Sequence, residues 1–314
     1  MDRAPLLALR RATKIYRRAN TEVTALQALD LDLSPGELVG LLGPNGSGKT
    51  TAVKLMTGLC TADEGEMAWR GQPVALGQHA AHLRELGVLL EGRGASYERL
   101  STLENARYFC RLREAHFDRG HFDALAALLD VPDIHAPIRQ LSTGNKLRAS
   151  LLGAMVHRPA LVLLDEPTLG LDLFGVERLE ALVRHTAQGG SAVLLGSHDL
   201  HFVERLSQRI VCLRQGRKVF DGSQREFLHI DHAVLLMLDC GGQPPPALPA
   251  SLNVPAWQAQ ADGSPGCWQL PLRDHAQVCA VLAALQPSLP AQRGLQLRQV
   301  SLRDKYLQLV GDTA

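Results

Sequence analysis

The stretch "ELVGLLGPNGSGKTT", residues 37–51, passes from an apolar segment through a glycine-rich turn to a lysine and two threonines. Its second part matches G-x-x-x-x-G-K-[ST], the pattern of a phosphate-binding loop between a strand and a helix. Residues 37–43 are an apolar run typical of a buried strand, and residues 49–56 have a helical pattern. In such a loop backbone N–H groups surround the phosphates, and the helix N-terminus adds the positive end of its dipole. The stretch therefore predicts a nucleotide-binding α/β domain.

Different residues of the loop are expected to contact different parts of the nucleotide and its metal ion. We expect Lys49 to reach the β- and γ-phosphates and the Thr50 hydroxyl to ligate Mg²⁺. A chance glycine-rich turn is the alternative, and the flanking strand and helix disfavour it. The predicted nucleotide-contacting residues of the loop are Gly43, Pro44, Asn45, Gly46, Ser47, Gly48, Lys49, Thr50 and Thr51.

A second strand ends in two carboxylates. In "LVLLDEPT" the apolar run of residues 161–164 is followed by Asp165 and Glu166. The carboxyl ends of parallel strands are where α/β sheets bind ligands. We therefore expect Asp165 to hold Mg²⁺ through water, and Glu166 to orient and polarise the attacking water. A solvated acidic turn is the alternative.

Strands and helices alternate over most of the chain, with further strands at 161–165 and 191–197, and helices near 173–185 and from about 200. Buried strands alternating with helices predict a mainly parallel sheet covered on both faces. Residues 92–158 differ, because their pattern is entirely helical and Ser101 to Glu104 form a capping box. We interpret them as a helical subdomain inserted into the α/β core.

Proline marks a boundary near the end of the chain, since nine of its seventeen prolines lie in residues 241–314. Such a segment is typical of a linker. We therefore expect a nucleotide-binding domain at 1–230, a helix and proline-rich linker at 231–264, and a small α+β domain at 265–314. The last of these is predicted from a strand at 267–272, a helix with Val278, Val281, Leu282 and Leu285 on one face, a strand at 295–300 and a capped helix at 301–311.

Composition limits the class of protein. A net charge of +1 gives no basic footprint for nucleic acid. Six cysteines without a CxxC pair are typical of reduced, buried thiols. The N-terminal residues lack the apolar run of a signal peptide, and no segment approaches the roughly 18 apolar residues of a membrane-spanning helix.

A second anion site is predicted where "LSTGNKLR", residues 141–148, begins a helix. The Ser142 hydroxyl, the Gly144 N–H and the helix end could hold a phosphate. One chain cannot direct this site and the phosphate loop at a single γ-phosphate unless it folds back sharply. Two chains packed head to tail can, which predicts a homodimer.

In this order the phosphate loop, "LSTGN", "DEPTLGLD" (165–172) and "GSHDL" (196–200) resemble the nucleotide-binding domain of ABC transporters. The resemblance covers about residues 6–230. It implies a P-loop NTPase core with N-terminal antiparallel strands, and ATP and Mg²⁺ as ligands. The family's signature is usually LSGGQ, so this chain departs from it at two of the five signature residues, Leu141, Ser142, Thr143, Gly144 and Asn145.

Other roles follow from the resemblance alone. Tyr16 matches the aromatic residue that stacks on adenine, although it could be an ordinary strand residue. His198 matches the histidine that contacts the γ-phosphate and the far subunit; a surface helix-capping histidine is the alternative. His198 and His201 could also suggest a metal pair, but zinc needs three or four ligands. Asp172 matches a loop that crosses the dimer interface.

Glu91 ends a further apolar strand, where the family usually has a glutamine that contacts Mg²⁺ and the lytic water. A carboxylate keeps an oxygen acceptor and gains a charge, which a hard cation accepts. We therefore predict Glu91 as a third Mg²⁺ ligand. The alternative is an exposed ion pair with Arg93, an interaction worth about 0–1 kcal/mol.

The stretch "LLEGRG…Y..LS..EN..YF" and the tail that ends in "SL.D.YL.L.G" resemble the ATPase subunits of drug- and antibiotic-type exporters. This implies separate membrane-spanning partner subunits and a peripheral place at the cytoplasmic face of the membrane. A soluble ABC ATPase acting on DNA or ribosomes is the main alternative, but only 92 residues lie between Lys49 and Ser142, too few for long inserted coiled coils. A nucleotide-binding regulator without turnover is a third interpretation, and the presence of Glu166 and His198 disfavours it.

Overall fold

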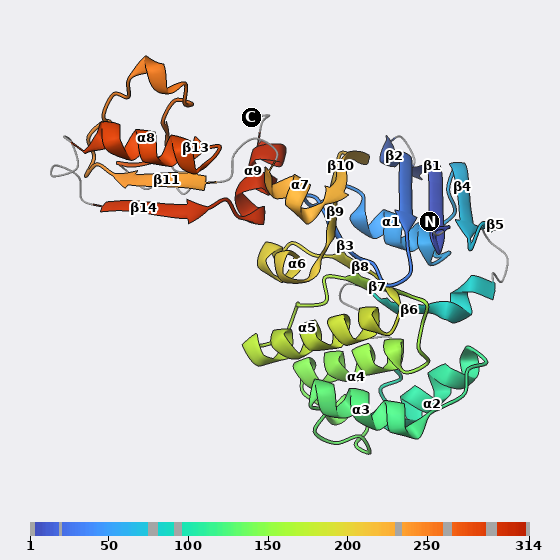
Figure 1. The fold of residues 1–314 in the computed structure, drawn as a ribbon. Helices are drawn as coiled ribbons and strands as arrows, with labels where there is room; N and C mark the ends of the chain where they lie inside the picture. The colour runs from blue at the N-terminus through green and yellow to red at the C-terminus, as the bar shows by residue number, and fades with distance from the viewer. Residues whose placement is uncertain are drawn as a thin grey trace. The chain divides into compact units, whose positions relative to one another are not determined.

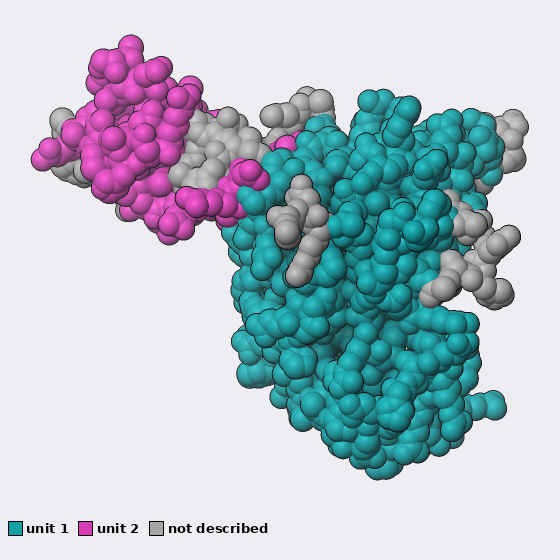
Figure 2. Space-filling view, turned by 45° about the vertical axis from the view of Figure 1, so that its right-hand side comes forward, with its two compact units in different colours: residues 1–224 teal, residues 225–314 magenta. Residues whose placement is uncertain are grey.

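The computed structural model describes residues 4–18, 21–74, 81–90, 96–229, 234–259, 266–286 and 294–311. The chain divides into two compact units, residues 1–224 and 225–314, which Figure 2 colours separately. Each unit has its own sheets and its own buried apolar cluster.

The first unit contains the following strands and helices, which Figure 1 shows: β1 Leu7–Arg18, β2 Thr21–Leu33, β3 Leu38–Leu42, α1 Lys49–Met56, β4 Glu64–Trp69, β5 Gln72–Pro73, β6 Leu86–Leu89, α2 Thr102–Leu112, α3 Arg119–Leu129, α4 Thr143–Met155, β7 Leu161–Asp165, α5 Leu173–Gln188, β8 Ala192–Gly196, α6 Leu200–Leu206, β9 Arg209–Arg214 and β10 Arg217–Ser223. Short 3₁₀ helices lie at Ala81–Glu85 and Ile138–Gln140.

Two sheets make up this unit. The first is antiparallel, with the strand order β2-β1-β4-β5. The second has the order β10-β9-β3-β8-β7-β6, and all its neighbours are parallel except β9 and β10. This mainly parallel sheet confirms the predicted fold class. In it β3, which leads into the phosphate loop, lies next to β8, and β8 lies next to the aspartate-ended β7.

Both faces of the parallel sheet are buried. Along β7, Leu161 and Leu163 join one apolar cluster, and Val162 and Leu164 join the other. Successive residues of a strand point to opposite faces, so a strand covered on both sides must be apolar throughout. Helices α2 to α6 cover one face, whereas α1 and the antiparallel strands cover the other. The near-continuous apolar runs in the sequence have this physical origin.

The predicted all-helical region is helical where it is described. Ser101 caps α2, because its hydroxyl accepts the Glu104 N–H at 3.2 Å while the Glu104 carboxylate accepts the Ser101 N–H at 2.8 Å. The predicted capping box is thus confirmed. The predicted helix at 49–56 also coincides with α1.

The second unit departs from the prediction for residues 231–264. Its elements are α7 Gln224–His229, β11 Val234–Asp239, a 3₁₀ turn Ala250–Leu252, β12 Gln258–Ala259, β13 Cys267–Leu272, α8 His275–Leu285, β14 Gly294–Gln299 and α9 Leu302–Gly311. Its antiparallel sheet has the order β12-β13-β11-β14, so β11 is an inner strand. The helix predicted there is wrong where the chain is described. The six apolar residues "AVLLML" fit a buried strand as well as a helix segment, and pairing on both sides favours the strand.

The proline-rich segment is not a free tether either. Leu248, Leu252, Val254 and Trp257 pack against the apolar cluster of the second unit, and the Trp257 indole N–H donates to the Pro246 carbonyl at 3.1 Å. Prolines lack an N–H to pair with a strand, but their side chains and neighbours still bury apolar surface. The predicted tail elements β13, α8, β14 and α9 are present, and Val278, Val281 and Leu285 of α8 are buried as expected.

Candidate active site

The phosphate loop joins the end of β3 to the start of α1. A Cβ atom at Gly43 would lie closer than 3.0 Å to the Ser47 hydroxyl and to the Leu213 carbonyl. At Gly48, which has φ 107°, a Cβ atom would also lie closer than 3.0 Å to the Ala25 carbonyl. Contacts of this kind leave no space for a side chain, so the packing of the loop requires glycine at positions 43 and 48. Asn45 and Gly46 are exposed at its tip.

Lys49 folds back over this loop. Its ammonium group donates to the Gly43 carbonyl at 2.7 Å and to the Pro44 carbonyl at 3.3 Å, and the residue is buried. A lysine ammonium has three donors and no acceptor, so it can hold the loop and a phosphate oxygen together. The ammonium charge therefore lies inside the loop, where the sequence predicts that it contacts the phosphates.

Thr50 and Asp165 come together although they are far apart in the sequence. The Thr50 hydroxyl donates to the Asp165 carboxylate at 2.8 Å. Asp165 is the last residue of β7 and is only 1% exposed. A Cβ atom at Gly196, at the end of β8, would lie 3.0 Å from Asp165 Oδ1, so this glycine gives the carboxylate its space. The two predicted metal-binding groups share one place at the C-terminal edge of the sheet.

Glu166 is held tightly beside this pair. Its N–H donates to the Gly196 carbonyl at 2.7 Å, and its backbone is left-handed, with φ 52°. The Oε2 atom accepts the Ser197 hydroxyl at 3.2 Å and the His198 N–H at 3.2 Å, and it lies 2.8 Å from His198 Nδ1. Three groups from the turn after β8 thus fix a buried carboxylate next to Asp165. The carboxylate cannot rotate away without losing them.

The structure adds two residues to those that the sequence indicated. Gly196 and Ser197 hold Glu166 through the carbonyl of the one and the hydroxyl of the other, and Ser197 also accepts the Asp199 N–H at 3.1 Å. Asp199 in turn caps α6. The signal was present in "GSHDL", where a small residue and a hydroxyl follow a strand adjacent to β7. Without the strand order, nothing in the sequence says that they face Glu166.

Tyr16 lies beside the far end of the phosphate loop. It belongs to β1 and is 38% exposed. Burial raises the pKa of its hydroxyl, while a hydrogen bond with the Thr51 side chain lowers it. Cys60 also hydrogen-bonds the hydroxyl, and the Lys14 ammonium lies 5.6 Å from the ring centroid. The ring is thus close to the loop, where the resemblance predicts that it stacks on adenine.

The signature residues 141–145 begin α4. The Ser142 hydroxyl accepts the Asn145 N–H at 3.3 Å, which caps the helix. Ser142 and Thr143 are exposed, whereas α1, which follows the phosphate loop, packs with the antiparallel strands on the other face of the sheet. The predicted second anion site is therefore on the surface of the helical layer.

Asp172 caps α5 through the Gly175 N–H at 2.7 Å, and Arg148 lies 3.6 Å from its carboxylate. Three large apolar side chains around it face solvent: Leu169 is 47% exposed, Leu173 68% and Phe174 66%. Grouped apolar side chains on a surface commonly mark an interaction site. Glu91, the third predicted Mg²⁺ ligand, lies outside the described residues.

The comparisons decide the family. A model described as "ABC transporter" matches residues 26–169. The daunorubicin resistance ATP-binding protein DrrA3 of Streptomyces coeruleorubidus is 31% identical over 296 residues, which are 92% of each chain. This chain belongs to the ATP-binding proteins of ABC transporters. The Nod factor export ATP-binding protein I of Burkholderia thailandensis is also similar, with 34% identity over 65% of this chain and 67% of the relative.

A solved structure shows the same fold. The dimeric bacterial ABC transporter cassette MJ0796 aligns with a TM-score of 0.63 at 23% identity, over 69% of this chain and 98% of the cassette. The predicted family and fold are thus confirmed, and the ABC protein described here is an ATP-binding ATPase. None of its described helices combines the length and apolar character needed to cross a membrane.

Proposed function

We propose that this ABC protein hydrolyses ATP to drive an exporter whose membrane-spanning part consists of separate subunits. The observation that supports catalysis best is the buried Glu166 carboxylate, fixed by the turn after β8 beside the Thr50–Asp165 pair. Export is supported by two similar proteins, one named for daunorubicin resistance and the other for Nod factor export.

The chemistry follows from the positions of the groups. Lys49 and the backbone of the phosphate loop would neutralise the β- and γ-phosphates. Glu166 would orient a water molecule toward the γ-phosphorus and accept its proton as the new P–O bond forms. The bond from the γ-phosphorus to the bridging oxygen breaks, which leaves ADP and inorganic phosphate. His198, whose ring contacts Glu166, would hold the γ-phosphate end of the nucleotide.

The residues at this edge of the sheet fit Mg²⁺. Thr50 and Asp165 offer only oxygen donors, and Mg²⁺ prefers oxygen ligands while keeping several waters. Within the described residues no group of three or more His, Cys, Asp or Glu side chains could hold a metal, so the phosphates and water would complete the shell. When bound, Mg²⁺ would neutralise charge on the phosphate oxygens. We keep Glu91 as a proposed third ligand.

The active form would be a head-to-tail homodimer. Ser142 caps a helix on one surface, and the phosphate loop belongs to another part of the same unit, so a second copy would supply the signature to each nucleotide. The exposed Leu169, Leu173 and Phe174 beside Asp172 would be covered in that dimer. Burying apolar surface contributes about 25 cal/mol per Å², which would stabilise the pair.

The partner in the membrane would meet the helical layer. Tyr97 and Tyr108 are 51% and 37% exposed, their hydroxyl groups lie 3.1 Å apart, and their rings meet edge to face. Tyrosine is enriched in protein interfaces because it combines a large apolar area with a polar tip. We propose that this pair contacts a membrane subunit, which would keep the ATPase at the cytoplasmic face of the membrane.

Co-purification from native membranes tests this assignment. A tagged chain should recover a polytopic membrane protein, and Tyr97→Arg together with Tyr108→Arg should reduce that recovery while the ATPase activity of the free chain persists. Recovery of the parent chain only from the soluble fraction, with no membrane protein attached, would contradict the exporter assignment and favour a soluble ATPase.

A further inference from the structure

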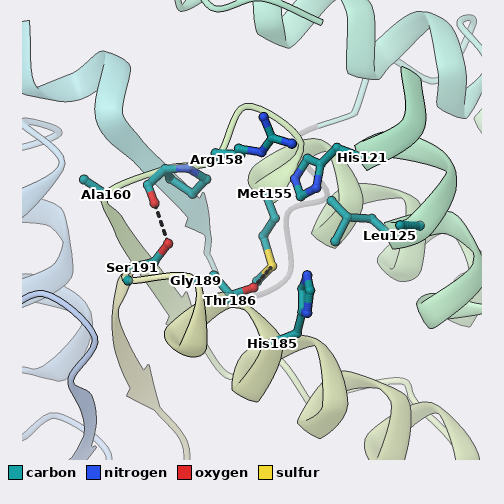
Figure 3. A pocket seen from close by; sticks show the side chains of 12 residues that line it. His121, Leu125, Met155, Arg158, Ala160, His185, Thr186, Gly189 and Ser191 are labelled. Atoms are coloured by element: carbon teal, nitrogen blue, oxygen red, sulfur yellow. Dashed lines mark hydrogen bonds between the residues drawn. The ribbon is translucent and has the colours of Figure 1, made fainter. Parts of the chain in front are cut away.

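A cavity of about 560 Å³ lies in the first unit, away from the predicted ATP site. It opens between α3, the end of α4 and the end of α5, as Figure 3 shows. Ala160 and Ser191 line it, and these residues come just before β7 and β8. Asp165 and Gly196 are at the other ends of the same strands. A ligand here would therefore not overlap with a nucleotide on the phosphate loop.

The ionisable side chains that line this cavity are all bases. His121 from α3, Arg158 after α4 and His185 from α5 surround the space, and none of the twelve lining residues is acidic. A carboxylate outside the lining, that of Asp118, pairs with Arg158 at 2.8 Å. A guanidinium group has five N–H donors, so Arg158 can hold Asp118 and an anionic ligand together, and no carboxylate lines the cavity itself.

The remaining polar groups of the wall are already satisfied. The Ser191 hydroxyl donates to the Pro159 carbonyl at 2.7 Å, and the Thr186 hydroxyl donates to the Leu182 carbonyl at 2.8 Å. The last carbonyls of α5 are hydrogen-bonded by the N–H groups of residues 189–191. Because these groups already have hydrogen-bond partners, the polar part of a ligand would be bound by Arg158, His121 and His185.

The rest of the wall is apolar. Leu125 and Met155 are buried core residues that also border the cavity, and Pro159 lies beside them. Burial, with Arg158 nearby, lowers the pKa of His121. A volume of this size and an apolar wall with a few polar groups are typical of small-molecule sites, which span about 300–1,000 Å³.

We propose that this cavity binds a small organic anion with an apolar body, which would place its acidic group at Arg158 and its apolar part against Leu125 and Met155. The inference does not depend on the exporter assignment, because it rests on the cavity and its basic lining alone.

A pair of matched probes tests both parts of this proposal. The dye 8-anilinonaphthalene-1-sulfonate carries an aromatic body and a sulfonate, and N-phenyl-1-naphthylamine has the same body without the charge. Fluorescence titrations would use the full chain saturated with Mg²⁺ and a non-hydrolysable ATP analogue, so that the phosphate loop is occupied. The parent chain should bind one equivalent of each probe.

Two variants then locate the site. Ala124→Trp places a large ring at an exposed position of the lining, and it should weaken both probes by at least about tenfold. Arg158→Asn should weaken the sulfonate by at least about tenfold but leave the neutral probe unchanged. Asparagine suits this position because Arg158 has φ 53°, a conformation that asparagine tolerates. Arg84→Asn removes another exposed, carboxylate-paired arginine and should change neither titration.

Three results would overturn the proposal. The first is that the parent chain fails to bind the sulfonate probe. The second is that Ala124→Trp binds both probes as well as the parent does, which would place them elsewhere. The third is that Arg158→Asn binds the sulfonate normally, which would leave an apolar cavity without selectivity for anions.

Discussion

Glu166 combines an unfavourable backbone with a well-satisfied side chain. Its φ of 52° is left-handed, a conformation that costs a non-glycine residue about 1–3 kcal/mol. Three hydrogen-bonding groups after β8 and the Gly196 carbonyl hold it there. Strain of this kind persists where the surrounding structure over-determines it, and here the hydrogen bonds fix the carboxylate against the turn after β8.

Replacing Glu166 by glutamine tests its role. Glu166→Gln keeps the backbone strain and one acceptor oxygen, so folding and ATP binding should persist. The hydrolysis rate should fall by at least about a hundredfold, or about 2.7 kcal/mol in barrier, because the amide cannot accept a proton from water. Steady-state ATPase assays of the parent, Glu166→Gln and the surface control Glu114→Gln measure this. Turnover by Glu166→Gln within about threefold of the parent would assign the role to another group.

Much of the candidate site could be predicted because its residues lie close together in the sequence. The phosphate loop, Thr50, Asp165 and Glu166 lie in two short motifs, each at the end of an apolar strand. The structure brings the two motifs together through the Thr50–Asp165 hydrogen bond. The left-handed φ of Glu166 and the hydrogen bonds from Gly196 and Ser197 depend on the strand order, which no local pattern encodes.

Between elements, α4 packs closely against β6. A Cβ atom at Gly87 would lie closer than 3.0 Å to the Ala154 carbonyl, so helix and strand meet with no side chain between them. Close backbone approach of this kind explains a glycine inside a strand, where it would otherwise weaken the sheet. The contact fixes the C-terminal half of α4, whose first turn carries the signature.

Gly87→Ala should therefore be destabilising. Overpacking a rigid contact costs about 1–3 kcal/mol, and here the neighbour is backbone and cannot rotate away. Gly120→Ala is the matched control, because its Cβ atom would meet only Asp118 Oδ1 at 3.5 Å and alanine favours the helix α3. Urea unfolding should show a loss of stability for Gly87→Ala alone. Equal midpoints for the two variants would mean that α4 shifts to accept the methyl group.

The free energy of unfolding should also depend on pH, through His157 just after the end of α4. Burial, with Arg113 nearby, lowers the pKa of His157 to about 4, and its Nε2–H donates to the Leu86 carbonyl at 3.1 Å. Since the unfolded state has the ordinary value of about 6.5, it binds the proton first as the pH falls. This contribution to stability is present above pH 6.5 and is lost progressively down to about pH 4.

His157→Gln isolates this contribution, because glutamine keeps an N–H donor for Leu86 but does not titrate. Between pH 6.5 and 4.5 the free energy of unfolding of the parent should fall more steeply than that of the variant, by up to about 1.4 kcal/mol per pH unit. Denaturant unfolding at several pH values measures both slopes. Parallel slopes would show that His157 takes up its proton without disturbing the fold.

At this scale the sequence is informative where a helical pattern follows a short apolar run. The strands β3, β7 and β8 are apolar on both faces and helices follow them, so their type could be predicted. The sequence does not reveal β11, because no helical pattern follows its short apolar run and its neighbours β13 and β14 both come later in the chain. A run of prolines likewise gave no sign that Trp257 would pack into a core.

At the scale of the whole molecule, one copy carries two predicted anion-binding motifs in different parts of its first unit. One chain holds a phosphate loop, a buried Glu166 and, on a separate surface, the Ser142 cap of α4. Exposed Leu173 and Phe174 lie next to Asp172, where the second copy would dock. The two anion-binding motifs could be recognised in the sequence, but the apolar residues around Asp172 became meaningful only once their exposure was known.

Nucleotide-dependent assembly tests this account most directly. Sedimentation velocity of Glu166→Gln should show a monomer without nucleotide and a dimer with Mg²⁺ and ATP, because the bound γ-phosphate would bridge the loop of one copy and Ser142 of the other. Adding Ser142→Arg or Phe174→Arg should return the protein to the monomer, whereas Arg84→Asn should leave the dimer intact. A single sedimenting species, the same with and without ATP, would contradict the shared site.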